Sequence, residues 1–275
     1  STRSHATSQP RRQAEVTAPP NVVACALPCA SAASASWSHS AWLRRPPRWK
    51  QAGRALARAL VKGAGLVLLD EPLANLDYKL REELRLEIPR IFEAAGSIFV
   101  YATTEPEEAL LLGGNTATLW EGRVTQFGPT PEVYRQPKDA TTARVFSDPP
   151  MNFLAVTKTG DSIRFGDGQE VPAIGSLAQL ADGRYLAGFR PNHLEIDRPG
   201  GAAMAFEARL RVTEITGSET FVHLDHHGER WVGLIHGVRD LELGAMLRVW
   251  LDPAHVYVFS TDGALVAPAA YAQAA

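Results

Sequence analysis

The stretch "LVLLDEPLANLD", from Leu66 to Asp77, decides the fold. Its first four residues are apolar, which is typical of a parallel strand buried on both faces of a sheet. Two adjacent carboxylates, Asp70 and Glu71, end the run, and a turn then leads to Asp77. A carboxylate at the carboxyl end of such a strand lies where α/β sheets bind their ligands. The stretch therefore predicts an α/β sheet with an acidic, ligand-binding edge.

The two adjacent acids suit a metal-dependent phosphate hydrolase. Asp70 is expected to act on Mg²⁺ directly or through the waters of the ion. Glu71 would face a γ-phosphate and orient or deprotonate a water molecule, and Pro72 would fix the turn that holds both acids. The alternative is that the acidic pair merely begins a helix, since acids are favourable near helix N-termini.

Helix and strand patterns alternate around this stretch. Residues 51–63 predict a short helix, because Leu56 and Leu60 lie four residues apart. Residues 97–103, "SIFVYAT", predict a second buried strand, and a hairpin is expected around Glu121-Gly122. Strand–helix–strand alternation at this spacing indicates an α/β sheet.

The segment after Asp77 predicts an amphipathic helix. Asp77 can cap its N-terminus, and Leu80, Leu84 and Ile88 recur at helical spacing to form one apolar stripe. Pro89 lies within the pattern and is expected to kink or split the helix.

The pattern changes near residue 148. Short alternating runs follow, separated by Gly, Asp and Pro turns, which predicts a small β-barrel. The predicted division is 1–50 as a disordered or non-native segment, 51–149 as part of an α/β domain, 150–268 as the β-barrel domain and 269–275 as a tail.

The first fifty residues differ in composition from the rest. They hold six Arg and one Lys against one acid, Glu15, and show no helical or strand period, so they are expected to lack a fixed fold. Residues 51–275 therefore carry the negative charge, which argues against a nucleic-acid partner. Cys25 and Cys29 are the only cysteines, and without further ligands at suitable spacing they are interpreted as two incidental thiols.

The chain carries, in order, "ALARALV", "LVLLDEPLANLD", "EALLLGG" with "EGRVTQFGPTPEVYRQP", and "PPMN". Their order and spacing resemble the ATP-binding cassette (ABC) family, and more closely the cytoplasmic ATPase subunits of sugar-type importers. Those subunits end in a β-barrel regulatory domain (TOBE or MOP type), to which residues 188–196, 217–220 and 251–259 are similar. The resemblance covers roughly residues 51–268. It implies part of a P-loop-NTPase-type nucleotide-binding domain followed by an OB-like β-barrel.

The resemblance also implies roles for four residues. Asp70 matches the Mg²⁺-associated Walker B acid, and Glu71 matches the catalytic glutamate. Asp77 matches the D-loop, a nucleotide-site segment that communicates between paired subunits, and Thr104 falls at the switch-histidine position. The implied cofactors are ATP and Mg²⁺. The implied partners are a second ABC ATPase subunit, identical or different, and integral membrane permease subunits, with the protein peripheral on the cytoplasmic face of the inner membrane.

Three departures from the family bear on activity. The chain has no Gly-Lys dipeptide, so it lacks the G-x-x-x-x-G-K-[ST] loop that holds the phosphates. It has "PPRWKQAGR" where the LSGGQ-like signature is expected. Thr104 can donate a hydrogen bond but cannot carry the charge of an imidazole, which either weakens hydrolysis or is a tolerated variation. The resemblance therefore implies an ATPase subunit truncated at its N-terminal side and inactive alone.

Two other functions remain open. In one, the chain is a non-catalytic regulatory or dimerisation module whose β-barrel binds a regulator or partner subunit. In the other, the barrel binds an oligonucleotide or an oxyanion, as small barrels of this type often do. The absence of a basic stripe with interleaved aromatics argues against the oligonucleotide.

Overall fold

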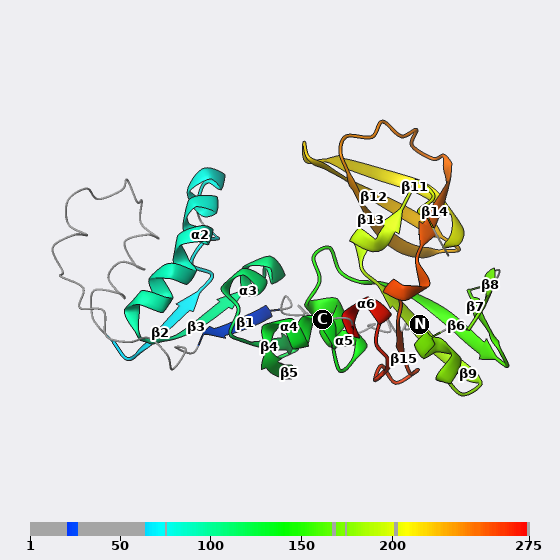
Figure 1. The fold of residues 1–275 in the computed structure, drawn as a ribbon. Coiled ribbons are helices and arrows are strands. Elements are labelled where there is room, and N and C mark those ends of the chain that lie inside the picture. Colours follow the sequence, from blue (N-terminus) through cyan, green and yellow to red (C-terminus); the bar gives the residue numbers. More distant parts are fainter. Residues whose placement is uncertain are drawn as a thin grey trace, which may run out of the picture.

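The computed structural model describes residues 21–26 by their backbone, together with residues 64–74, 76–166, 169–173, 175–200 and 203–273. Figure 1 shows an α/β unit that contains β2, β3 and α2, and a β unit that contains β11 to β14. Short helices α4, α5 and α6 lie between the two units. The predicted order of an α/β part followed by a β part is confirmed.

The first sheet has the strand order β2-β3-β1-β4-β5. Its strands are β1 (Asn21–Ala26), β2 (Leu66–Asp70), β3 (Ile98–Thr103), β4 (Asn115–Trp120) and β5 (Arg123–Pro129). β2 and β3 are parallel, with Asp70 opposite Ala102, whereas the other neighbouring pairs are antiparallel. The carboxyl ends of β2 and β3 therefore meet at one edge of the sheet.

Strand β1 corrects the expectation of disorder over residues 1–50. Its backbone pairs antiparallel with β3 on one side and with β4 on the other. Such ladders satisfy the main-chain N–H and C=O groups of the strand, and a run as short as "NVVACA" is too brief to show a period in the sequence. The other residues of that segment, like the helix predicted over 51–63, lie outside the described residues.

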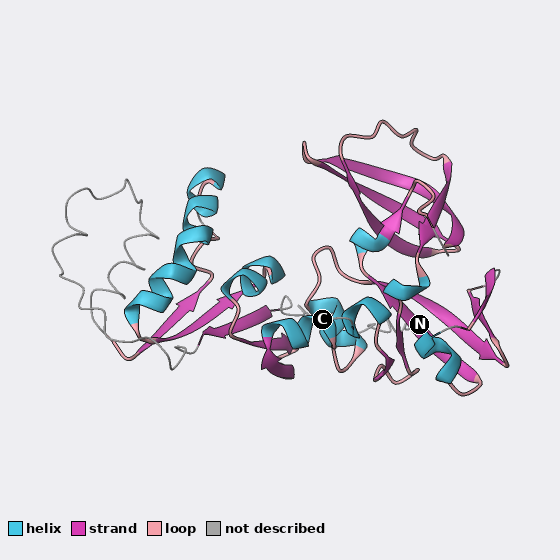
Figure 2. Cartoon of the chain, viewed as in Figure 1, coloured by secondary structure: helices cyan, strands magenta, loops and turns pink. Residues whose placement is uncertain are grey.

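Helix α2 (Tyr78–Ala95) packs along the first sheet (Figure 2). Its buried residues, Leu84, Ile88 and Phe92, confirm the predicted apolar stripe, and the Phe92 ring stacks on Phe99 of β3 at a centroid distance of 3.8 Å. The helix continues through Pro89, so this proline does not split it, and the kink expected there remains a prediction. Buried contacts on both sides of the proline offset the single backbone hydrogen bond that it removes.

Only one face of β2 is buried. Val67 is 6% exposed and packs with the α2 stripe, whereas Leu66 and Leu68 are 54% and 70% exposed. The prediction of burial on both faces is therefore wrong for this strand. Successive side chains of a strand point to opposite faces, and among the described residues α2 covers the Val67 face.

A hairpin and three short helices complete this unit. Glu121 and Gly122 connect β4 to β5 with φ of 49° and 73°, as a tight hairpin with two left-handed residues requires, so the predicted hairpin is confirmed. The helices are α3 (Pro106–Leu112), α4 (Thr130–Arg135) and α5 (Ala140–Val145).

The β unit is a near-closed barrel of two sheets. One sheet has the order β10-β14-β11-β12-β13 and the other β16-β15-β9-β6-β7-β8. Its strands are β6 (Asn152–Thr159), β7 (Ser162–Phe165), β8 (Gln169–Pro172), β9 (Gly183–Phe189), β10 (Leu194–Glu195), β11 (Met204–Ile215), β12 (Glu219–His226), β13 (Glu229–His236), β14 (Met246–Leu251), β15 (Tyr257–Phe259) and β16 (Leu265–Ala267). Both sheets contribute to one core around Trp231, which is fully buried, so the predicted barrel is confirmed.

Three short 3₁₀ helices and one α-helix complete the β unit. They are η2 (Gly175–Gln179), η3 (Pro191–His193), η4 (Pro253–His255) and α6 (Ala270–Gln273). The segment predicted as a tail thus includes a helix, and its Ala269 and Ala272 are buried with Ala143 of α5. Among the described residues no helix is long and apolar enough to cross a membrane.

Candidate functional site: the acidic edge of the first sheet

Asp70 and Glu71 lie where the sequence predicts them, at the carboxyl end of β2. Asp70 is the last residue of the strand and is exposed. The N–H of Glu71 donates to the carbonyl of Ala102 at 2.9 Å, so the β2–β3 ladder extends to Glu71. Within the described residues neither carboxylate makes a hydrogen bond or an ion pair. Both groups are therefore able to bind a cation or a water molecule.

Glu71 has a strained backbone. Its φ is +45°, in the left-handed region that residues other than glycine rarely adopt. The bond to Ala102 fixes its N–H, and Pro72 restricts the conformation of the residue before it. Strain of this kind is often found at functional sites. The catalytic role of Glu71 remains a prediction, and the strain at this residue agrees with it.

Asp77 begins α2. Its side chain accepts a hydrogen bond from the N–H of Leu80 at 3.0 Å, and its own backbone is extended. This is the geometry of a helix N-cap, and the predicted capping role is confirmed. A role in contact with nucleotide or a paired subunit remains a prediction.

Thr104 is exposed and directly follows β3. Because β2 and β3 are parallel, with Asp70 opposite Ala102, Thr104 lies beyond the same edge as Asp70 and Glu71. The fold thus puts at one sheet edge the three residues that match the Walker B acid, the catalytic glutamate and the switch-histidine position, namely Asp70, Glu71 and Thr104. Their individual roles remain predictions.

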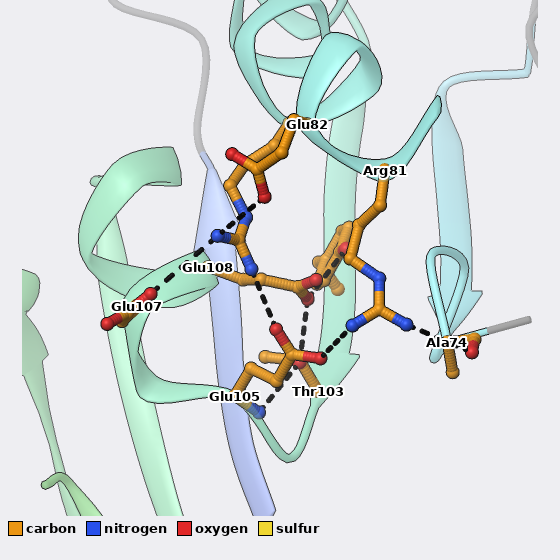
Figure 3. A network of polar contacts seen from close by, with 9 residues as sticks. Ala74, Arg81, Glu82, Thr103, Glu105, Glu107 and Glu108 are labelled. Carbon is orange, nitrogen blue, oxygen red and sulfur yellow. Dashed lines mark hydrogen bonds and ion pairs between the residues drawn. The ribbon is translucent and has the colours of Figure 1, made fainter. Parts of the chain in front are cut away.

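A polar network that the sequence analysis did not identify borders this edge (Figure 3). Glu105, the residue after Thr104, accepts hydrogen bonds from Arg81 at 3.2 Å and from Arg85 at 2.7 Å. Arg81 also donates to the carbonyl of Ala74 at 3.3 Å. The available signal was the spacing of the two arginines, four residues apart on one helix face. Their acidic partner, Glu105, lies 24 and 20 residues further along the chain, and no local sequence pattern connects it to them.

A buried carboxyl group supports the end of β3. Glu108 of α3 is 4% exposed and accepts hydrogen bonds from Tyr101 at 2.9 Å and from Thr103 at 2.7 Å. Burial raises the pKa of Glu108, and the two hydrogen bonds act in the opposite direction. Burial, together with the nearby Glu108, raises the pKa of Tyr101. Thr103, the residue before Thr104, is therefore anchored to the core by its hydrogen bond to Glu108.

The described residues offer one ligand for a metal ion but no cradle for a triphosphate. Asp70 is an exposed carboxylate, which is a suitable oxygen ligand for Mg²⁺. A phosphate loop, in contrast, connects a strand to the N-terminus of a helix at the ligand-binding edge. β1 runs antiparallel to β3, with Ala26 opposite Phe99, so the carboxyl end of β1 lies at the edge away from Asp70. With no Gly-Lys dipeptide in the chain, these residues do not fit MgATP as a whole.

Among the described residues no group of three or more His, Cys, Asp or Glu is arranged to hold a metal ion. A cation at this edge would thus depend on Asp70, water and the phosphates of a nucleotide. That arrangement is usual for Mg²⁺, which keeps several waters and binds one or two carboxylates together with substrate phosphates.

Comparisons with known proteins agree with this combination of units. The family model described as the TOBE domain matches residues 187–259. An sn-glycerol-3-phosphate import ATP-binding protein of Yersinia enterocolitica is 29% identical over 81% of this chain and 64% of its own length. A protein of the same description from Chromobacterium violaceum is 32% identical over 80% of this chain and 60% of its own length.

A sulfoquinovosyl glycerol transport ATP-binding protein of Agrobacterium fabrum is 32% identical over 74% of this chain and 58% of its own length. The solved structure of the cytoplasmic molybdate-binding protein ModG, with molybdate bound, is matched over 40% of this chain and 95% of its own, at 17% identity. The TM-score of 0.31 is too low for that likeness to carry an argument.

An α/β unit with two acids at a strand end, followed by a TOBE β-barrel, is the combination that the resemblance to ABC ATP-binding proteins predicts. The chain is similar over about four fifths of its length to ATP-binding proteins of import systems, and its barrel carries the TOBE match. It spans about three fifths of the length of these relatives.

Proposed function

We propose that this chain is the ATP-binding subunit of an ABC importer for a sugar- or polyol-type solute, in which ATP hydrolysis is coupled to transport. The observation that carries the proposal is the placement of Asp70 and Glu71 at the end of β2, beside the exposed Thr104. The TOBE match in the same chain supports it. Asp70 would hold Mg²⁺, Glu71 would position or deprotonate the attacking water, and Thr104 would donate a hydrogen bond to the γ-phosphate.

The partners in this proposal are a second ABC ATPase subunit and membrane permease subunits at the cytoplasmic face of the membrane. The relatives are import and transport ATP-binding proteins, which supports this part of the proposal. Asp77 and the turn before it would face the paired ATPase subunit. The solute class is taken from the same relatives.

The chain alone is expected neither to bind MgATP tightly nor to hydrolyse it. Affinity for a triphosphate comes chiefly from backbone N–H groups and a lysine that act together as an anion nest. The described residues form no such nest beside Asp70, because the carboxyl end of β1 lies at the other edge of the sheet. Each missing charge-assisted hydrogen bond removes roughly 1.5–3 kcal/mol. Calorimetric titration with MgATP tests this expectation, and micromolar binding would contradict it.

A chimera tests the proposed roles. Residues 64–273 of this chain would follow the phosphate-loop part of the Chromobacterium violaceum relative, and phosphate release would be measured with and without Glu71→Gln. The expected result is MgATP-dependent turnover that Glu71→Gln reduces at least a hundredfold. Removal of a group that acts only in the transition state lowers the turnover rate. Turnover that Glu71→Gln leaves unchanged would refute the role of Glu71. The same chimera with Thr104→His shows whether the threonine weakens hydrolysis.

A second function is favoured by one observation, namely that the family model matches only the barrel, residues 187–259. In this alternative the barrel is the working part and binds a regulator or a partner subunit without nucleotide. Sedimentation of the chain without nucleotide distinguishes the two, because the alternative requires stable self-association or regulator binding in its absence.

A further inference from the structure

Arg81 connects two loops that are far apart in the sequence. One Nη atom donates to Oε1 of Glu105 at 3.2 Å, and the other donates to the carbonyl of Ala74 at 3.3 Å. Ala74 lies in the turn between Glu71 and Asp77, and Glu105 directly follows Thr104. We infer that Arg81 and Glu105 form a positioning clamp, which holds the turn after Glu71 in a fixed place relative to the Thr104 loop.

Arg85 fixes the carboxylate that Arg81 uses. It donates to Oε2 of Glu105 at 2.7 Å, while Arg81 occupies Oε1, so each carboxylate oxygen has its own guanidinium partner (Figure 3). The side chains of Arg81, Arg85 and Glu105 are 28%, 18% and 32% exposed. Partial burial and two charge-assisted bonds make this arrangement stronger than an isolated surface ion pair.

The Thr104 side of the clamp is anchored to the core. The N–H of Glu105 donates to Oγ1 of Thr103 at 3.0 Å, and Thr103 donates in turn to the buried Glu108. Thr104 therefore lies between Thr103 and Glu105, and hydrogen bonds fix both of these neighbours. A displacement of its loop would have to move Glu105.

The turn on the other side is anchored to the core by Leu73, which is 2% exposed, but its internal hydrogen bonds are weak. Its described backbone bonds are long, with the N–H of Ala74 donating to the carbonyl of Glu71 at 3.3 Å and the N–H of Leu76 to the carbonyl of Leu73 at 3.2 Å. The bond from Arg81 to Ala74 joins this turn to the core through Glu105. The rigidity of the turn after Glu71 should thus depend on the side chain of Glu105, which follows β3.

This inference goes beyond the proposed function and does not rest on it, because it concerns the order of two loops in the chain without nucleotide. Water–amide exchange measured by NMR on the full chain tests it. Glu105→Gln should speed exchange at the amides of Ala74 and Leu76 by about tenfold, since a lost charge-assisted bond is worth about that factor. Arg81→Gln should do the same, and the double variant should add little to either single change.

Two further variants separate positioning from a general loss of structure. Glu87→Gln removes an ion pair of the same helix, at 2.9 Å from Arg90, and should leave Ala74 and Leu76 unchanged. Arg81→Lys keeps the charge but cannot reach both partners in the fixed fork of a guanidinium. It should restore slow exchange at Glu105 more fully than at Ala74.

The amides of α2 report whether each variant remains folded. If Arg81→Gln loses protection throughout α2, the isosteric Glu105→Gln variant decides the question. Faster exchange at Ala74 and Leu76 with an intact α2 supports the clamp. If Glu105→Gln accelerates only residues 103–106, the two loops are independent and the inference is overturned.

Discussion

The guanidinium of Arg190 lies 3.6 Å from the ring centre of Tyr134 and donates a hydrogen bond to the carbonyl of the same residue at 2.6 Å. It also donates to the carbonyl of Phe146 at 2.9 Å. Arg190 directly follows β9 of the barrel, whereas Tyr134 and Phe146 belong to the α4–α5 segment. Arg190 is 2% exposed, and no carboxylate among the described residues pairs with it. A single buried cation, held by carbonyl groups and an aromatic face, therefore joins the two units.

Substitution of Arg190 is expected to loosen this junction. Arg190→Gln should lower the free energy of unfolding by about 2–4 kcal/mol, because two buried carbonyls lose charge-assisted donors and the ring loses its cation. Urea unfolding monitored by tryptophan fluorescence measures the change. Arg184→Gln, at an exposed position of β9, is the matched control. Equal midpoints for the Arg190 and Arg184 variants would contradict the assignment.

The predicted boundary near residue 149 cuts through a shared core. Ala143 of α5, Tyr257 and Phe259 of β15, and Ala272 of α6 belong to one buried cluster. The N–H of Leu265 also donates to the carbonyl of Lys138 at 2.9 Å. A fragment of residues 150–268 should therefore be less stable than one of residues 137–273, by about 3 kcal/mol or more, because the cluster loses its buried apolar neighbours.

Thermal unfolding of the two fragments measures this difference, and a fragment of residues 137–268 isolates the contribution of α6. Both larger fragments should melt cooperatively, since the Trp231 core lies within them. If residues 150–268 melt at the same temperature as 137–273, the shared cluster contributes nothing and the barrel is an independent domain.

The pair of His193 and His255 predicts a loss of stability in acid. Their rings stack at a centroid distance of 4.0 Å, and Tyr271 packs edge-on against both. Burial, followed by the proximity of His255 and Arg190, lowers the pKa of His193 to about 3. The unfolded chain binds this proton at its ordinary pKa of about 6.5. The stabilising contribution is therefore complete above about pH 6.5 and is lost progressively as the pH falls towards 3.

The measurement is the free energy of unfolding from pH 7 to pH 4. One extra proton bound by the unfolded state gives a slope of up to about 1.4 kcal/mol per pH unit. His193→Gln should flatten the dependence by nearly this amount, whereas His236→Gln, at a side chain 92% exposed, should not. An unchanged slope in His193→Gln would show that His193 is not the group that titrates.

Glu108 gives a prediction for the end of β3. Glu108→Ala leaves the hydroxyl groups of Tyr101 and Thr103 without an acceptor, and burying them unpaired should cost about 2–4 kcal/mol in the free energy of unfolding. Glu108→Gln keeps a carbonyl oxygen as acceptor and removes a buried charge, so it should cost less than about 1 kcal/mol. Chemical denaturation of the two variants compares them, and equal losses would contradict the role of the acceptor.

Much of the local structure could be predicted from the sequence. The apolar run before Asp70, the capping aspartate Asp77 and the hairpin at Glu121-Gly122 each have a pattern within a few residues, and the structure has a strand, an N-cap and a hairpin at these places. The alternating runs after residue 148 likewise became the barrel strands. Periodicity and turn chemistry act over short distances along the chain, so they are visible in the sequence.

Tertiary structure alone decided which of these elements meet. It exposed Leu66 and Leu68 on one face of β2, placed β1 between β3 and β4, and paired Arg81 with Glu105 across 24 positions of sequence. The composition of residues 1–50 gave no sign of β1, and the pattern of β2 gave no sign of an exposed face. Burial and ion pairing depend on which distant segments pack together, because side-chain contacts form in space and not along the chain.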